Sequence, residues 1–378
     1  MKSKFATIIM SIIIIIIIGV IGIFGIIVLQ EFYQIDIYDE VENFVTDFST
    51  INNEDNLTQK IEAPPIIQEQ LDGVESTLNN IKNVDYTNIK VNKHFYNQLR
   101  EESKILYKAF ESNKENMKTG TYKIEFGTAF TTLLSKKNGQ DLLRDYYQSA
   151  IEAYTHDNPD VFYLDAQKMY LNVETITKGS NVTYNAYINS GNEQNYLVNE
   201  FNTKEKVDNA IAKLENIRSV VIQNKQQTTY DNIKMVHDYL VQTIEYESTI
   251  SKNNIYNIYG ALINKECVCE GYAKSFKYLM DGLNIPCLVV SGKATDSQGK
   301  IENHAWNYVE INGMWYAVDT TWDDPVIIGN GKISNTRKYK YFLVGEDKIN
   351  VDHIPEGKFT EKGKEFLYPE LSKESHIK

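Results

Sequence analysis

Three cysteines, one histidine and one aspartate have types and spacing that suit catalysis by a thiol. Cys267, Cys269 and Cys287 fall within one short region, and His304 and Asp319 follow them. In such a set a thiolate attacks a carbonyl carbon, a histidine moves the proton, and a carboxylate fixes the tautomer of the imidazole. An odd number of cysteines also leaves at least one thiol outside any disulfide framework. We therefore predict Cys269 as nucleophile, His304 as base and Asp319 as the orienting acid.

Cys269 is expected at the N-terminus of a buried helix. After it, apolar residues recur at steps of three or four until Pro286: Tyr272, Phe276, Leu279 or Met280, and Leu283. Free backbone N–H groups and the positive end of the helix dipole would lower the pKa of a thiol there and receive an oxyanion. The pattern predicts that Cys269 is reactive and that Cys287, in an apolar strand run, is buried and inert. Taken alone, the helix start favours the interpretation of Cys269 as a small buried hydrophobe over a reactive thiol.

A β-hairpin is predicted to hold His304 beside Asp319. Asn312-Gly313 separates two strand-like runs and favours a two-residue type I′ turn, which pairs Ile311 with Met314. In this register His304 and Asp319 are diagonal neighbours on one face, about 7–8 Å apart at the backbone. We expect the N-terminus of the Cys269 helix to pack over that same face. A one-residue bulge would separate the two side chains and leave Asp319 as a strand-end cap.

Four motifs share an order and a spacing with a known family. They are Cys269-x-Gly271-Tyr272-Ala273, then Gly292, then His304-Ala305-Trp306-Asn307, and finally Trp315-Tyr316-x-Val318-Asp319-x-Thr321-Trp322-Asp323-Asp324-Pro325. Together they resemble the transglutaminase-like superfamily, specifically its bacterial extracellular members. The core of the resemblance runs from about residue 230 to 324, and a softer similarity reaches back to Asp157 and forward to His353.

The resemblance implies an α+β, papain-like fold, with the cysteine on a helix and the histidine and aspartate on an antiparallel sheet. It implies the same roles for Cys269, His304 and Asp319, and acyl transfer through a thioester on peptide or glutamine carboxamides. Hydrolysis, as in a protease or amidase, and cross-linking, as in a transglutaminase, both remain open. The alternative is an inactive module of the same fold that binds a surface protein or the cell wall. Tyr259, which matches an aromatic residue of relatives, is the candidate for a second oxyanion donor.

No metal or organic cofactor is predicted. Cys267, Cys269, Cys287 and His304 could be read as a zinc site, but Cys-x-Cys lacks the usual spacing of about two to four residues. His156, next to Asp157, is more typical of a loop at a helix end, and His237 within a helix is more typical of a structural residue. Two states of Cys267 stay open, an inert thiol or a disulfide with Cys287.

The N-terminal residues predict a membrane anchor. No charged residue occurs from Ala6 to Leu29, a stretch that at about 1.5 Å per residue could cross a hydrocarbon core of about 30 Å. Lys2 and Lys4 precede it and acidic residues follow, so we expect a single span with a cytoplasmic N-terminus and an extracellular catalytic domain. Residues 28–32 lack the small residues of a signal-peptide cleavage site.

Four regions are predicted along the chain: a cytoplasmic tip and transmembrane anchor at 1–30, a mostly helical stalk at 31–118, a small α/β accessory region at 119–205, and the catalytic core at 206–370. Within them we expect helices at 142–154, 206–222 and 230–244, and strands at 161–164 and 184–188.

The charge of the chain argues against nucleic-acid binding. The formal net charge is -12 over 378 residues, whereas phosphate binding requires a basic surface. The expected partner is a protein or peptide substrate, by location a cell-wall or surface protein.

Overall fold

The computed structural model describes residues 57–59, 61–324, 338–356 and 366–377. All of them belong to one compact unit, Leu57–Lys378. The predicted anchor at 6–29 lies outside the described residues.

The predicted localisation needs correction. Within the part of the chain that the structure describes, no helix is both long and apolar enough to cross a membrane.

The sheet that carries the candidate site is antiparallel and has the strand order β10-β7-β8-β9. Its strands are β7 (Cys287–Thr295), β8 (Ile301–Ile311), β9 (Met314–Val318) and β10 (His353–Pro355). The predicted β8–β9 hairpin is confirmed, because Ile311 pairs with Met314 and Asn307 with Val318. Asn312 and Gly313 both have positive φ, 53° and 81°, as a type I′ turn requires.

Three long helices accompany this sheet: α8 (Lys204–Gln223), α9 (Thr229–Thr243) and α10 (Cys269–Gly282). The hydroxyls of Thr203 and Thr228 cap α8 and α9 by accepting from Lys206 N and Asp231 N. A π-helical segment, η5 (Gly260–Asn264), and a short parallel pair, β5 (Glu245–Tyr246) with β6 (Glu266–Cys267), connect α9 to α10. The three helices were predicted from apolar periodicity.

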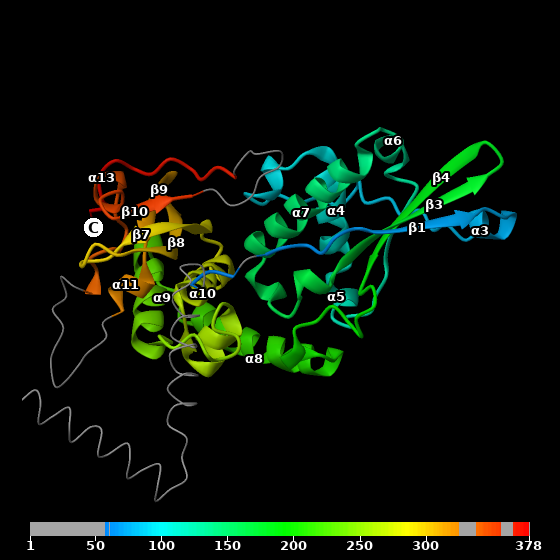
Figure 1. Ribbon diagram of the computed structural model, residues 1–378. Helices are drawn as coiled ribbons and strands as arrows, with labels where there is room; N and C mark the ends of the chain where they lie inside the picture. The colour runs from blue at the N-terminus through cyan, green and yellow to red at the C-terminus, as the bar shows by residue number, and fades with distance from the viewer. Residues whose placement is uncertain (1–56, 60, 325–337, 357–365, 378) are drawn as a thin grey trace, which may run out of the picture. The chain divides into compact units, whose positions relative to one another are not determined.

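A second sheet has the order β1-β3-β4-β2. Its strands are β1 (Ile67–Asp72), β2 (Ile124–Gly127), β3 (Tyr170–Lys178) and β4 (Asn181–Asn189), and β1 runs parallel to β3. The helices of this part are α3 (Glu75–Asn79), α4 (Glu101–Ser112), α5 (Lys114–Met117), α6 (Thr131–Leu134) and α7 (Gly139–Asp157), with short 3-10 turns at Tyr96–Gln98, Ala166–Lys168 and Asn199–Phe201. Figure 1 shows this sheet and the site-bearing sheet at opposite ends of the described unit.

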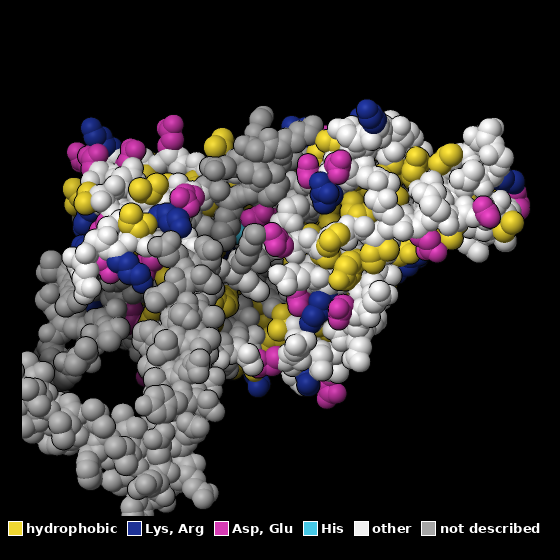
Figure 2. Space-filling view, in the orientation of Figure 1, with side chains coloured by type: hydrophobic (Ala, Val, Ile, Leu, Met, Phe, Trp, Pro, Cys, Tyr) yellow, Lys and Arg dark blue, Asp and Glu magenta, His cyan; other side chains and the backbone are white. Residues whose placement is uncertain are grey.

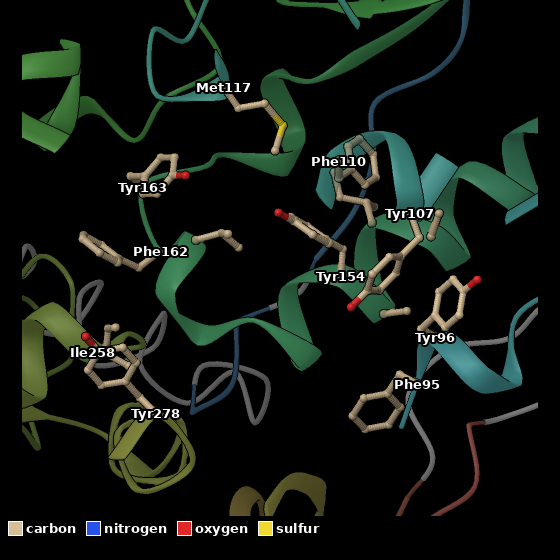
Figure 3. Close-up of a cluster of buried hydrophobic side chains, with 14 of the residues drawn as sticks. Phe95, Tyr96, Tyr107, Phe110, Met117, Tyr154, Phe162, Tyr163, Ile258 and Tyr278 are labelled. Atoms are coloured by element: carbon tan, nitrogen blue, oxygen red, sulfur yellow. The ribbon is translucent and has the colours of Figure 1, made fainter. Parts of the chain in front are cut away.

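Two local expectations differ from the structure. Residues 161–164, predicted as a strand, do not form one. Val161 ends a 3-10 turn, Pro159–Val161, because proline fixes a φ that suits such a turn, and Leu164 makes only an isolated bridge to Leu197. Residues 31–118 were predicted to form a mostly helical stalk. The described part of this region instead adds β1 to the second sheet and packs α4 into the hydrophobic core. One hydrophobic cluster contains both Phe110 of α4 and Phe276 of α10, and Figure 3 shows side chains of both regions within it.

The drawn face of the described unit mixes charges of both signs. Figure 2 shows lysine and arginine side chains interspersed with aspartate and glutamate.

Candidate active site

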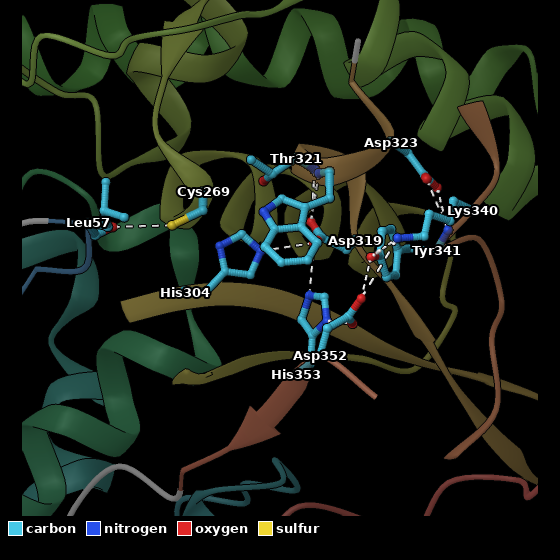
Figure 4. A network of polar contacts seen from close by, with 11 residues as sticks. Leu57, Cys269, His304, Asp319, Thr321, Asp323, Lys340, Tyr341, Asp352 and His353 are labelled. Atoms are coloured by element: carbon cyan, nitrogen blue, oxygen red, sulfur yellow. Dashed lines mark hydrogen bonds and ion pairs between the residues drawn. The ribbon is translucent and has the colours of Figure 1, made fainter. Parts of the chain in front are cut away.

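Cys269 is the first residue of α10, as predicted, and it is fully buried. Its side chain packs with Ala273, Val289 and Ala305, and Leu57 covers this small cluster. The thiol donates a hydrogen bond to the carbonyl oxygen of Leu57 at 3.3 Å, which Figure 4 shows as a dashed line. The nucleophile candidate therefore lies in a closed site.

The predicted lowering of the Cys269 pKa is wrong for this arrangement. Burial raises the pKa of the Cys269 thiol, and the nearby charges of Glu270 and Asp319 add to the rise. Hydrogen bonds from the backbone N–H groups of Ala305 and Glu270 lower the pKa of the thiol, but by less than burial and the two charges raise it. The thiol is thus protonated as long as the site stays closed.

The other two cysteines are also free thiols. Cys267 and Cys287 are buried, and no disulfide links any of the three, so Cys267 is a reduced thiol in this structure. Burial raises the pKa of Cys267 and of Cys287. Cys267 lies against Gly271, where an added Cβ would come within 2.5 Å of the Cys267 Cβ. The glycine of the Cys269 motif is therefore needed for close packing of α10.

His304 and Asp319 lie together as the hairpin register predicted. His304 Nε2 is 2.9 Å from Asp319 Oδ2, and both residues are about 1% exposed. The β8–β9 pairing ends at Asn307 and Val318, so Asp319 lies beyond the ladder and caps the short helix α11 (Thr320–Asp323). In Figure 4 the His304 ring lies between the Cys269 thiol and the Asp319 carboxylate.

Helix α10 packs on the face of the sheet opposite to the one we expected. The side chains that contact it are Val289, Ala305 and Asn307, whereas Trp306 packs with residues of the other face. Asn307 fixes the helix by donating to the carbonyl oxygens of Ala273 at 2.9 Å and Leu288 at 3.0 Å. Cys269 therefore approaches β8 from this other face, where the backbone N–H of Ala305 lies next to its sulfur.

Four donors surround the Asp319 carboxylate. Oδ1 accepts from Thr321 N at 3.0 Å and Trp322 N at 3.2 Å. Oδ2 is shared by His304 and by His353, whose Nε2 lies 3.1 Å away. Burial alone would raise the pKa of Asp319, but the two histidines outweigh it and hold that pKa well below its usual range. An ionised Asp319 is the state that can orient an imidazole.

His353 is the residue that sequence reasoning missed. It is fully buried on β10, and its Nδ1 lies 2.7 Å from Asp352 Oδ1, while Tyr341 donates to the other Asp352 oxygen at 2.6 Å. Burial lowers the pKa of His353, but the hydrogen bonds and charges of Asp319 and Asp352 raise it above its ordinary value. The only sequence signal for His353 was its place in the softer part of the resemblance.

Gly292 is what allows β10 to approach the site. A Cβ at this position would lie 2.1 Å from the backbone oxygen of Ile354, the residue after His353. The glycine therefore permits the close contact of β7 and β10 that brings His353 to Asp319.

Aromatic rings enclose the histidines. His304 stacks on Trp306 with ring centroids 6.0 Å apart, and Trp322 lies 5.2 Å from His304 and 4.6 Å from His353. Such rings exclude water from the imidazoles. Tyr259, the candidate oxyanion donor, instead has its ring among Phe162 and Phe201.

The two acids next to the site have partners of their own. Asp323 accepts from the backbone N–H of Tyr341 and lies 3.1 Å from His237 Nε2, and burial raises the pKa of Asp323 to about 6. Asp324 accepts from the Tyr272 hydroxyl at 2.5 Å. His237 therefore sits in a second buried network rather than at the thiol.

One group of side chains in the described part of the chain has the spacing of a metal site. His304, Asp319 and His353 offer ligand atoms within 4.8 Å of one another. Both imidazole Nε2 atoms are already within hydrogen-bonding distance of Asp319 Oδ2, which accounts for the arrangement without a metal. The zinc set considered from the sequence is not among the groups found in the described residues.

Comparison with known proteins finds a family match for part of the chain. The model of the transglutaminase-like superfamily matches residues 218–320, a range that holds Cys269, His304 and Asp319. Residues 218–320 form a transglutaminase-like domain. The chain is also similar to kyphoscoliosis peptidase of Mus musculus, 29% identical over 98 residues, and of Homo sapiens, 24% identical over 148 residues.

These likenesses are partial. The matches cover 24% and 35% of this chain and only 15% and 22% of the mouse and human peptidases, so the chain spans less than a quarter of either relative. A crystal structure of a TGase is similar at 14% identity and a TM-score of 0.29, over 46% of this chain and 50% of that one.

Proposed function

We propose that the chain is a thiol-dependent acyl-transfer enzyme acting on peptide or glutamine carboxamides. In this proposal Cys269 attacks the carbonyl carbon, His304 takes the thiol proton and gives it to the leaving amine, and Asp319 orients the imidazole. Water or an amine then releases the acyl group from the thioester. The observation that carries the proposal is the buried His304–Asp319 pair, 2.9 Å apart, beside a thiol at the start of α10.

The helix start supports the same chemistry. In this proposal the backbone N–H of Glu270, which lies next to the Cys269 sulfur at the helix start, receives the oxyanion of the tetrahedral intermediate. The aromatic enclosure of His304 strengthens electrostatic interactions at the imidazole by excluding water.

The test combines thiol labelling with turnover. The purified protein is treated with a thiol-directed electrophile and mapped by peptide mass spectrometry, and ammonia release from a glutamine peptide is followed with water or hydroxylamine as acceptor. We expect Cys269→Ala and His304→Ala each to abolish turnover. Cys287→Ala is the matched control, since it removes a buried thiol outside the proposed site and should retain turnover.

Two results would contradict the proposal. Turnover that survives Cys269→Ala would exclude a thioester on this residue. A complete lack of turnover together with specific binding of a protein would favour the inactive binding module instead.

A further inference from the structure

The chain supplies its own occupant for the space above the candidate nucleophile. Residues 57–59, which precede β1 in the chain, lie over the start of α10. Leu57 packs on the apolar cluster of Cys269, Ala273, Val289 and Ala305, and its carbonyl oxygen accepts from the Cys269 thiol. This position, an apolar side chain in a small depression with its carbonyl facing the thiol, is the one that the acyl residue of a substrate would take.

The segment is held by further contacts along the chain. Gln59 N donates to the carboxylate of Glu270, the second residue of α10. Farther on, the side-chain amide of Gln148 on α7 donates to Ile61 O at 2.7 Å and accepts from Ala63 N at 2.8 Å. β1 then pairs with β3 over six residues.

We propose that residues 57–59 occupy the acyl-side subsite of the enzyme in cis and thereby keep Cys269 closed. The proposal rests on the proposed function and deepens it, because it names the substrate class: a peptide with a leucine-sized apolar residue whose carbonyl faces the thiol. The segment must leave before a substrate can enter, so it also restrains activity. The burial of Cys269 follows from this occupancy.

The test measures the rate at which iodoacetamide alkylates Cys269 in the full chain, by peptide mapping. Leu57→Asp places a charge in the apolar cluster and should expel the segment, and Gln148→Ala removes two tethering hydrogen bonds. We expect the alkylation rate to rise about tenfold with Leu57→Asp, the scale of losing one partly buried leucine, and by a smaller factor with Gln148→Ala.

Two matched variants serve as controls. Leu367→Asp makes the same change at a leucine that is 72% exposed, and Gln140→Ala removes an exposed hydrogen bond between α7 and Gln68 of β1. Both should alkylate at the rate of the unmodified chain.

A peptide then tests the subsite itself. A synthetic peptide with the sequence of residues 57–62 should slow alkylation of the Leu57→Asp chain, and the same peptide with aspartate in place of leucine should not.

The outcomes separate this proposal from the proposed function. Equal alkylation of the unmodified and Leu57→Asp chains, with no protection by the peptide, would overturn the occupancy whether or not turnover is found. Faster alkylation and higher turnover in Leu57→Asp would support both. Faster alkylation and protection by the peptide, without turnover in any variant, would support an apolar peptide site over Cys269. The same result would contradict the proposed acyl-transfer function.

Discussion

His353→Gln is the substitution that most sharply tests how the site is built. His353 lies 3.1 Å from Asp319 and 2.7 Å from Asp352, so it faces a carboxylate oxygen with each ring nitrogen. An imidazole that donates from both nitrogens carries a positive charge. Glutamine has a similar reach and can donate to Asp319 but carries no charge. The variant therefore removes the charge with little change in shape.

The expected magnitude follows from the hydrogen bonds of Asp319. A hydrogen bond to a charged group contributes about 1.5–3 kcal/mol, which corresponds to roughly 10- to 100-fold in rate if it is transmitted fully. Three other donors remain on Asp319, from His304, Thr321 and Trp322. We therefore expect a loss of about tenfold in kcat with little change in KM.

The variant should also change how stability depends on pH. The pKa of folded His353 is raised, so its contribution to the free energy of unfolding is fully present below the pKa of an unfolded histidine, about 6.5, and is lost as pH rises through the folded-state pKa. The groups that face His353 are Asp319 and Asp352, with His304 and Tyr341 close by. The difference in Tm between the unmodified chain and His353→Gln should thus be large in mild acid and shrink as pH rises.

Steady-state kinetics and thermal unfolding across pH provide the measurements. His94→Gln is the matched control, because His94 Nε2 contacts only the backbone oxygen of Leu367 in a partly exposed position. Full activity in His353→Gln, with a pH-independent Tm difference like that of His94→Gln, would refute the reasoning.

Four further substitutions test the surrounding structure. Asp319→Asn should lower kcat by on the order of 10³- to 10⁴-fold, because it no longer holds His304 in the tautomer that acts as a base. Asp323→Asn should mainly lower Tm. A greater loss of activity in Asp323→Asn than in Asp319→Asn would mean that the orienting acid is misassigned. Gly292→Ala should lower both Tm and kcat, since its Cβ would lie 2.1 Å from the Ile354 oxygen, and unchanged circular dichroism and kinetics would contradict this. Asn307→Ala should lower the free energy of unfolding by about 2–3 kcal/mol in urea titrations by removing two buried hydrogen bonds, and a change below about 0.5 kcal/mol would show that those bonds are weak.

Some features of this protein were determined by the sequence alone. Apolar periodicity from Cys269 onward, ended by Pro286, encodes helix α10 locally. A turn whose two residues accept positive φ encodes the β8–β9 register. Because a two-residue turn fixes which residues face each other, the sequence alone placed His304 beside Asp319.

Other features were decided only by the tertiary structure. His353 reaches Asp319 across 34 residues because β10 pairs with β7, and no local pattern specifies such a contact. The face on which α10 packs, and therefore the route from the thiol to His304, depends on which side of the sheet the whole chain covers. The pKa of Cys269 shows the same limit: the helix start favours a thiolate, yet burial beneath Leu57 raises the pKa, because desolvation depends on every segment that surrounds the sulfur.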